Sequence, residues 1–155
     1  PYTGILSTFC RRARGGEPID VFEDGAESRD FVFIDDVVEA TRRALLHPNA
    51  PDAGAINVGS GVATTLRDLA DIVVRLGGWD VPVRVTGGYR EGDVRHALAD
   101  TRRASRVLGF AAATPLDEGL RRWLRWVDGA AGLNAGDAAT EQLAARGLYH
   151  RAEGM

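Results

Sequence analysis

The segment RDFVFIDDV, at residues 29–37, constrains the fold of this chain more than any other. Aromatic and β-branched side chains fill residues 31–34, which predicts a strand that begins near Arg29. Asp35 or Asp36 can cap a helix that starts directly after this strand. The segment therefore predicts a strand and a helix joined without a loop.

The rest of the sequence alternates apolar helical stripes with short extended runs, and glycine or proline often ends a run. Helices are predicted at 3–14, 36–46, 65–76, 100–108, 114–127 and about 138–145, and further strands at 19–22, 55–58 and 81–85. Thr65 and Asp68 form a capping box. A turn signal at 23–25 makes residues 19–34 a hairpin-like pair of strands. The pattern predicts a mixed α/β fold whose strands are too few and too short for a self-sufficient doubly wound sheet.

Composition excludes several classes of protein. The 155 residues suit one domain, and a net charge of −3 offers no basic field for nucleic acid or for an anionic membrane. No apolar run approaches the roughly 20 residues that span a bilayer. Cys10 is the single cysteine, which favours a reducing compartment such as the cytoplasm. His47, His96 and His150 are scattered along the chain, so no metal site is predicted.

All 19 basic residues are arginine, for which codon bias in a GC-rich genome is the simplest cause. The chain therefore cannot form a Schiff base on lysine, use a phosphate-loop lysine, or supply the lysine of a Tyr-x-x-x-Lys proton relay. The sequence also opens at Pro1 without methionine, and a helical stripe already begins at Thr3. We therefore expect the chain to be a piece of a longer protein.

Three features can converge on one ligand. Arg29 lies at the mouth of a strand, where its planar charged group can hold a phosphate through two hydrogen bonds. The loop REGD follows another strand, and its glycine permits a tight turn, so that Arg90 and Asp93 can face one site. Such a pair suits a nucleoside diphosphate, with the arginine on phosphate and the aspartate on ribose hydroxyls. At the end of the 19–22 strand, Phe22 can stack on a base while backbone amides read the polar edge of that base.

Each feature also has an ordinary structural interpretation. Arg29 can pair with Glu27 or Asp30 at the surface. Arg90 can pair with Asp93 inside its own loop. The aromatic residue that closes the 19–22 strand can belong to the core. The residues alone therefore leave both interpretations open.

The segment AINVGSG, at residues 55–61, has the same ambiguity. Asn57 can lie near a ligand, or it can satisfy a neighbouring backbone group. The run GSG follows a predicted strand but lacks a third glycine and an immediate helix, which indicates a turn rather than a dinucleotide-binding loop.

Four motifs follow one another along the chain: DVFEDGAESRDFVFIDDV at 20–37, AINVGSG at 55–61, YREGDVRHALADTRRASRVLGF at 89–110 and TPLDEGLRRWLRWV at 114–127. In this order they resemble the C-terminal portion of the extended short-chain dehydrogenase/reductase family, the NAD-dependent nucleotide-sugar epimerases and dehydratases. The opening PYTGILSTF at 1–9 and LAARGL at 143–148 most resemble its 4-epimerase branch. The resemblance covers nearly the whole chain.

The resemblance implies that this chain carries a substrate-binding site for a nucleoside diphosphate. The implied residues are Arg29 and Arg90 on the diphosphate, Asp93 on the ribose, Phe22 and the backbone of Val21 at the base, and Asn57 near the phosphates.

The resemblance also implies which groups this chain lacks. In the family, a tyrosine takes a proton from the sugar hydroxyl while NAD accepts hydride, and a lysine lowers the pKa of that tyrosine. These groups and the glycine-rich NAD loop belong to the N-terminal half, so NAD would be bound mainly there and no catalytic residue is assigned here. Tyr2, Tyr89 and Tyr149 cannot fill that role without a lysine.

The function implied is 4-epimerisation of a dTDP- or UDP-hexose through an NAD-dependent 4-keto intermediate, with this fragment inactive alone. A nucleotide-sugar 4,6-dehydratase and a non-catalytic module that binds a nucleotide sugar or a protein partner are the alternatives. A homodimer is compatible with the resemblance.

The expected architecture is the α/β substrate-binding portion of an extended short-chain dehydrogenase, without most of the Rossmann sheet. Residues 1–128 would bind the sugar nucleotide, and about 35–60 would pack on the missing Rossmann domain. Residues 129–155 would form a C-terminal helix or tail. Without the missing domain, apolar faces of the 36–46 helix and the 55–58 strand would be exposed.

Overall fold

The structure, a computed structural model, describes residues 4–48, 54–129 and 144–150. The chain divides into two compact units, which are described separately. The first unit comprises residues 1–27, 65–95 and 120–155, and the second comprises residues 28–64 and 96–119.

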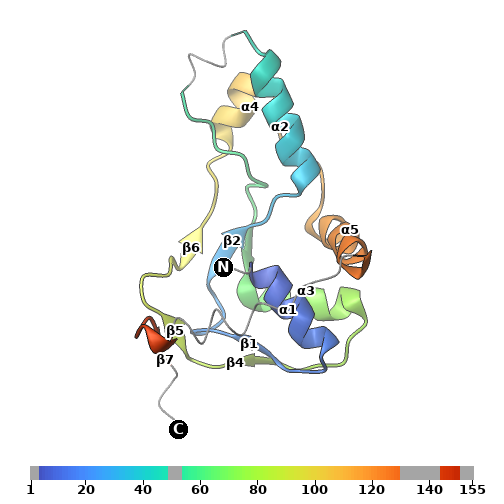
Figure 1. The fold of residues 1–155 in the computed structure, drawn as a ribbon. Coiled ribbons are helices and arrows are strands. Elements are labelled where there is room, and N and C mark those ends of the chain that lie inside the picture. The colour runs from blue at the N-terminus through green and yellow to red at the C-terminus, as the bar shows by residue number, and fades with distance from the viewer. Residues whose placement is uncertain (1–3, 49–53, 130–143, 151–155) are drawn as a thin grey trace. The chain divides into compact units, whose positions relative to one another are not determined.

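Helices and short strands alternate along the described residues, which confirms the mixed α/β fold that the sequence predicts (Figure 1). The helices are α1 (Ile5–Arg14), α2 (Ile34–Leu46), α3 (Leu66–Gly77), α4 (Arg102–Leu108) and α5 (Leu116–Gly129). The strands are β1 (Ile19–Val21), β2 (Ser28–Asp30), β3 (Ala63–Thr65), β4 (Val83–Val85), β5 (Tyr89–Arg90), β6 (His96–Ala97) and β7 (Tyr149–His150).

In the first unit, α1 packs against α3, and both helices lie against β1 (Figure 1). β1 pairs in parallel with β4, and Ile19 and Val21 are fully buried between the strands and the helices. A second buried cluster joins α1 to α5 through Cys10, Leu124 and Val127. Burial of a large apolar side chain contributes about 1.5–3 kcal/mol, so these clusters stabilise the unit.

The third predicted helix, α3, follows its sequence signals closely. The hydroxyl of Thr65 accepts a hydrogen bond from the N–H of Asp68 at 3.0 Å, as the capping box predicts. Gly78, with a φ of 66°, ends the helix in the left-handed conformation that other residues rarely adopt. The buried face lies between these caps and consists of Leu66, Leu69, Ala70 and Val73.

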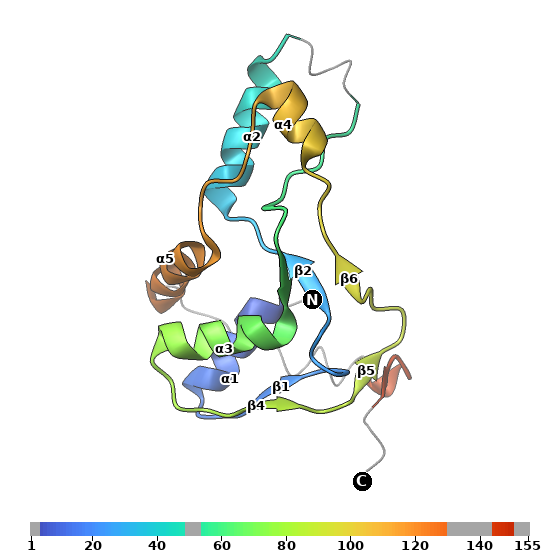
Figure 2. The same ribbon diagram turned by 180° about the vertical axis from the view of Figure 1, so that it is seen from behind.

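In the second unit, α2 and α4 lie side by side (Figure 2). β2 is the central strand of a small sheet, between β3 and β6, and it runs parallel to β6. The core is a cluster of small and large apolar side chains from both helices and the segment after α4: Ala40, Ala104, Leu108 and Phe110, with Ile56 and Val58 packed against it.

The predicted hairpin of residues 19–34 is wrong. β1 pairs with β4, whereas β2 pairs with β3 and β6, so neighbours in sequence belong to different sheets. β2 also ends at Asp30, and residues 31–33 form no strand. The reason is the length of the partner, because β6 pairs only with Ser28 and Arg29 and offers no ladder beyond them.

The predicted strand at 55–58 is also absent from the described residues. Ile56 and Val58 are half-buried and pack against the α2–α4 cluster. Their apolar character therefore reflects packing against helices, without hydrogen bonding to another strand.

The start of α2 differs from the prediction as well. The helix begins at Ile34 with Phe33 as its N-cap, so neither Asp35 nor Asp36 caps it. The buried carboxylate of Asp36 instead accepts hydrogen bonds from the backbone N–H groups of residues 113 and 114, each at 3.1 Å. This carboxylate ties α2 to the segment that leads into α5.

Most of the predicted helix at 138–145 lies outside the described residues. Among the helices that the structure does describe, none is both long enough and apolar enough to cross a membrane.

The carboxylate of Asp30 holds the glycine-rich loop at residues 59–61. Oδ1 accepts hydrogen bonds from the N–H of Ser60 at 2.7 Å and from its hydroxyl at 2.5 Å, and Oδ2 accepts from the N–H of Gly61 at 3.0 Å. The N–H of Ala99 adds a fourth bond at 3.3 Å. Burial alone would raise the pKa of Asp30, but these hydrogen bonds outweigh it and lower the pKa. The run GSG therefore bends around the carboxylate of Asp30, which agrees with the predicted turn in place of a dinucleotide-binding loop. The role of Asp30 was not predicted.

Gly59→Ala is expected to destabilise the protein by about 1–3 kcal/mol, measured by urea unfolding. A Cβ at this position would meet the Asp30 carboxylate and would lie 2.5 Å from the Cβ of Ala99. Gly129→Ala is the control, because an added Cβ there meets nothing within 4 Å and alanine favours the helix. An unchanged urea midpoint for Gly59→Ala would contradict this account.

Candidate functional site

The loop after β1 presents Phe22 on a tightly bonded backbone. The carbonyl of Phe22 accepts a hydrogen bond from the N–H of Gly25 at 2.9 Å, which closes a turn. The N–H of Glu23 donates to the carbonyl of Gly88 at 2.8 Å, and Glu23 itself has a φ of 45°. A non-glycine residue rarely adopts this left-handed conformation, so surrounding contacts must hold it there.

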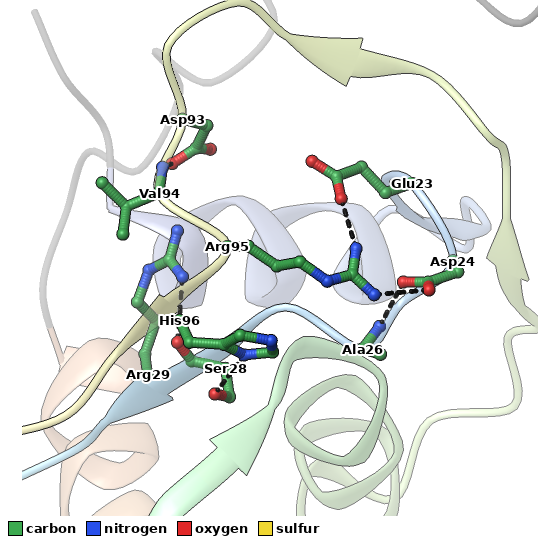
Figure 3. A network of polar contacts seen from close by, with 9 residues as sticks. All are labelled: Glu23, Asp24, Ala26, Ser28, Arg29, Asp93, Val94, Arg95 and His96. Atoms are coloured by element: carbon green, nitrogen blue, oxygen red, sulfur yellow. Dashed lines mark hydrogen bonds and ion pairs between the residues drawn. The ribbon is translucent and has the colours of Figure 1, made fainter.

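Arg95 makes some of the contacts that hold Glu23 in this conformation (Figure 3). Its two terminal nitrogens donate to Oε2 of Glu23 and to Oδ2 of Asp24, each at 2.6 Å. The other oxygen of Asp24 accepts from the N–H of Ala26 at 3.0 Å. The hydrogen bond from Arg95 lowers the pKa of Asp24, so the contact holds two carboxylates that would otherwise repel each other.

Phe22, Arg90 and Tyr149 form an aromatic–arginine cluster in the first unit. The guanidinium carbon of Arg90 lies 5.3 Å from the centroid of the Phe22 ring. The ring of Tyr149 lies 5.1 Å from the same ring, tilted by 41°. Nε of Arg90 is buried and, within the described residues, has no hydrogen-bond partner. A buried charged donor without an acceptor is costly, so the cluster is suited to an incoming anion.

The loop after Arg90 turns as the sequence predicts. Gly92 has a φ of 79°, and the N–H of Asp93 donates to the carbonyl of Arg90 at 3.3 Å. One carboxylate oxygen of Asp93 accepts from the N–H of Val94 at 2.9 Å (Figure 3). The first unit therefore carries Phe22, Arg90 and Asp93, each on a backbone segment that is held by hydrogen bonds.

Val21 belongs to the same unit but is already engaged. Its side chain is fully buried, and its carbonyl accepts hydrogen bonds from the N–H of Thr86 at 2.9 Å and from the hydroxyl of Thr86 at 3.3 Å. Two donors occupy this carbonyl, so it is not available to a ligand.

Glu27 is a buried carboxyl that sequence reasoning did not select as a site residue. It is only 5% exposed, and Oε2 has no hydrogen-bond partner among the described residues. Burial raises its pKa, and the nearby charges of Glu23, Asp24 and Asp93 raise it further. Glu27 therefore favours its neutral form more than an exposed glutamate does.

The second unit carries the other two predicted residues. Arg29 lies in β2, and its Nη1 donates to the carbonyl of Ser28 at 2.9 Å (Figure 3). The hydroxyl of Ser28 lies 2.9 Å from Nδ1 of His96 on β6. Asn57 is exposed, between two half-buried apolar residues. The six predicted residues are thus divided between the two units.

Comparisons with known proteins agree on one family. Residues 2–59 match the NAD dependent epimerase/dehydratase family. The chain is 39% identical over 127 residues to a dTDP-L-rhamnose 4-epimerase from Burkholderia thailandensis, covering 81% of this chain and 34% of the relative. It is 35% identical over 122 residues to a UDP-glucose 4-epimerase from Mycolicibacterium smegmatis, covering 77% of this chain and 37% of the relative.

A solved structure leads to the same conclusion. The UDP-glucose 4-epimerase of Thermotoga maritima, determined with UDP-glucose, superposes with a TM-score of 0.73 at 30% identity. The match covers 83% of this chain and 40% of that one. The chain belongs to the NAD-dependent epimerase/dehydratase family. It spans between 34% and 37% of the length of these two curated family members.

NAD is the cofactor of the family, and the glycine-rich loop of this chain does not fit it. The N–H groups of Ser60 and Gly61 are bonded to the carboxylate of Asp30, so they are not available for a pyrophosphate.

Sequence reasoning missed three residues that shape the site. Arg95, Glu27 and Tyr149 each act through contacts with residues far away in the sequence or through burial. A single sequence carries no periodicity that reveals such contacts. The one available signal was the group of three carboxylates within residues 23–27.

Glu27→Gln is expected to stabilise the protein by about 1 kcal/mol at pH 8, and by much less at pH 4. The folded-state pKa of Glu27 is raised, so its stabilising contribution is complete below the unfolded pKa of about 4.3 and is lost as pH rises through the folded value. Glutamine keeps the shape and removes the ionisation.

Urea unfolding of both proteins between pH 4 and pH 8 measures this difference. Glu118→Gln, at an exposed position on α5, is the matched control and should show no comparable dependence on pH. A Glu27→Gln effect of the same size at every pH would refute the ionisation cost.

Proposed function

We propose that this chain is the nucleotide-sugar-binding part of an NAD-dependent nucleotide-sugar 4-epimerase. The aromatic–arginine cluster is the observation that carries the proposal. It presents a buried guanidinium nitrogen with no acceptor in the described part of the chain, directly beside an aromatic ring. A nucleoside diphosphate has the matching groups, since its phosphate oxygens accept hydrogen bonds and its base has a flat π surface.

Each predicted residue has a role in this proposal. In the first unit, Arg90 binds the diphosphate, Asp93 accepts hydrogen bonds from the ribose hydroxyls and Phe22 contacts the base. The carbonyl of Val21 already accepts hydrogen bonds from Thr86. The contribution of Val21 is therefore the packing of its buried side chain next to Phe22 in the sequence. In the second unit, Arg29 binds the diphosphate and Asn57 lies near the phosphates, as the family resemblance implies.

The names of the relatives support the nucleotide and the reaction. The curated relative with 39% identity is a dTDP-L-rhamnose 4-epimerase, and that with 35% identity is a UDP-glucose 4-epimerase. We therefore propose a dTDP- or UDP-hexose as substrate and inversion at C4 as the reaction, in the cytoplasm. NAD would supply reversible oxidation of the sugar, bound by parts of the intact protein outside this chain.

The product distinguishes this proposal from its nearest rival. Incubation of the intact protein with NAD and a UDP- or dTDP-hexose should yield the 4-epimer, with no loss of water from the sugar. A 4-keto-6-deoxy sugar would identify a 4,6-dehydratase instead. Tight binding of UDP or dTDP by the isolated chain, without turnover in any form, would favour a non-catalytic module.

α2 exposes a surface that fits a partner domain. Ile34, Val38 and Leu45 share one side of the helix and are 62%, 58% and 83% exposed. The opposite side, with Ala40 and Ala44, packs in the α2–α4 cluster. We propose that the NAD-binding part of the intact protein covers this exposed stripe, since each curated relative extends well beyond the matched region.

The isolated chain should therefore self-associate as its concentration rises, measured by analytical ultracentrifugation. Replacement of Ile34, Val38 and Leu45 by lysine together should yield a monomer. The matched control replaces Val62, Val94 and Leu98 by lysine, which removes three similarly exposed apolar side chains elsewhere. A wild-type chain that is monomeric at every concentration, or a control that dissociates equally well, would count against the proposed covered face.

Arg29→Ala in the intact protein should raise KM for the nucleotide sugar by about 10- to 100-fold and leave kcat largely unchanged. The reason is that Arg29 holds the diphosphate, which does not react, in both the ground state and the transition state. Steady-state kinetics measure both constants. Arg106→Ala, at an exposed position on α4, is the control. A large fall in kcat with KM unchanged would show that Arg29 does not act by binding alone.

A further inference from the structure

The strand β7 brings a second aromatic ring to the cluster that contains Arg90. We propose that Tyr149 is a specificity residue, whose ring contacts the base of the bound nucleoside diphosphate while Arg90 holds the phosphates. This inference rests on the proposed function and adds a residue that neither the sequence motifs nor the family resemblance selects.

Strand pairing fixes the position of Tyr149. β5 and β7 are neighbouring strands (Figure 1) and run antiparallel. Their register places Arg90 directly opposite Tyr149. Opposite residues of an antiparallel pair project from the same face, with their Cβ atoms about 4.5–5.5 Å apart. Tyr149 therefore shares one face of the ladder with Arg90. The centroid of its ring lies 5.1 Å from the centroid of the Phe22 ring.

A turn at residues 144–147 leads into β7. Gly147 has a φ of 69°, and its N–H donates to the carbonyl of Ala144 at 3.0 Å. The carbonyl of Leu148 then accepts from the N–H of Glu91 at 3.1 Å, which extends the contact between β7 and the REGD loop. The strand is thus bonded directly to the loop that contains the predicted diphosphate and ribose residues.

The cluster favours a ligand that is both anionic and aromatic. Nε of Arg90 is buried without an acceptor in the described part of the chain, whereas the exposed Arg67 is paired with Asp71 at 3.0 Å. A phosphate oxygen would satisfy this nitrogen. The Phe22 ring already has both Arg90 and Tyr149 as neighbours, so a base that enters here meets Tyr149 as a further aromatic surface.

A purely structural role for Tyr149 makes a different prediction. If the ring only covered Phe22 and oriented Arg90, its loss would weaken every phosphate ligand, whether or not that ligand carries a base. If the ring contacts the base, its loss weakens nucleoside diphosphates alone. Inorganic pyrophosphate separates these roles, because it has the phosphates without the base.

The experiment is calorimetric titration of the intact protein with UDP, dTDP and inorganic pyrophosphate. Tyr149→Ala should weaken UDP or dTDP binding by about 5- to 100-fold and change pyrophosphate binding less than about twofold. Arg90→Ala should weaken all three ligands. Tyr89→Ala is the matched control, because the neighbouring position of β5 projects from the opposite face.

Two further variants distinguish the loss of the ring from a general loss of folding. Tyr149→Leu keeps an apolar side chain against Phe22 without a ring, and it should lose nucleotide affinity as the alanine variant does. Tyr149→Phe should retain most of it. Circular dichroism should show that each variant is folded.

Unchanged UDP and dTDP affinity in Tyr149→Ala, or an equal loss of pyrophosphate, would overturn the role of Tyr149 and leave the proposed function intact. Failure of the wild-type protein to bind either nucleotide would overturn both.

Discussion

The second unit depends on the carboxylate of Asp30. Four hydrogen bonds converge on it from two separate segments, and the absence of a side chain at Gly59 makes room for it. Neighbouring residues of a strand point to opposite faces, so fixing Asp30 on one face of β2 fixes Arg29 on the other. The motifs RDF and GSG are thus two halves of one contact. The aspartate anchors the strand, and the arginine is the residue that this anchor presents.

The first unit brings several carboxylates close together, and their negative charges must be offset before an anion can bind. The charges of Glu23, Asp24 and Asp93 all act on Glu27, and these carboxylates together would repel an anionic ligand. Arg95 neutralises the first two through direct hydrogen bonds, and burial favours the neutral form of Glu27. The REGD loop adds Asp93, and Arg90 in the same loop has a buried Nε with no acceptor among the described residues. The distribution of charge therefore suits a ligand with hydroxyls at one end and phosphates at the other.

Local signals predicted the helices, and distant contacts decided the rest. The caps of α3 and the apolar stripes of α3 and α5 depend on residues within a few turns, so the sequence alone contains them. The parallel partners β1 and β4 are more than 60 residues apart, and nothing local specifies their pairing. For the same reason Phe22, Arg90 and Asp93 could be selected individually from the sequence, whereas the contact of Tyr149 with Phe22 could not. The prediction of a strand at 55–58 was wrong because alternating apolar residues fit a strand and fit equally well a segment that packs on helices.

Arginine supplies all 19 Lys or Arg positions of this chain, which limits what these side chains can do chemically. Arginine stays charged at every pH at which a protein is folded, so it holds phosphate without taking part in proton transfer. The family resemblance implies a lysine that lowers the pKa of a catalytic tyrosine, and this chain contains no lysine. Among the described carboxyls of the first unit, burial raises the pKa of Glu27. Any pH dependence that this chain adds to nucleotide binding would therefore come from groups other than its arginines.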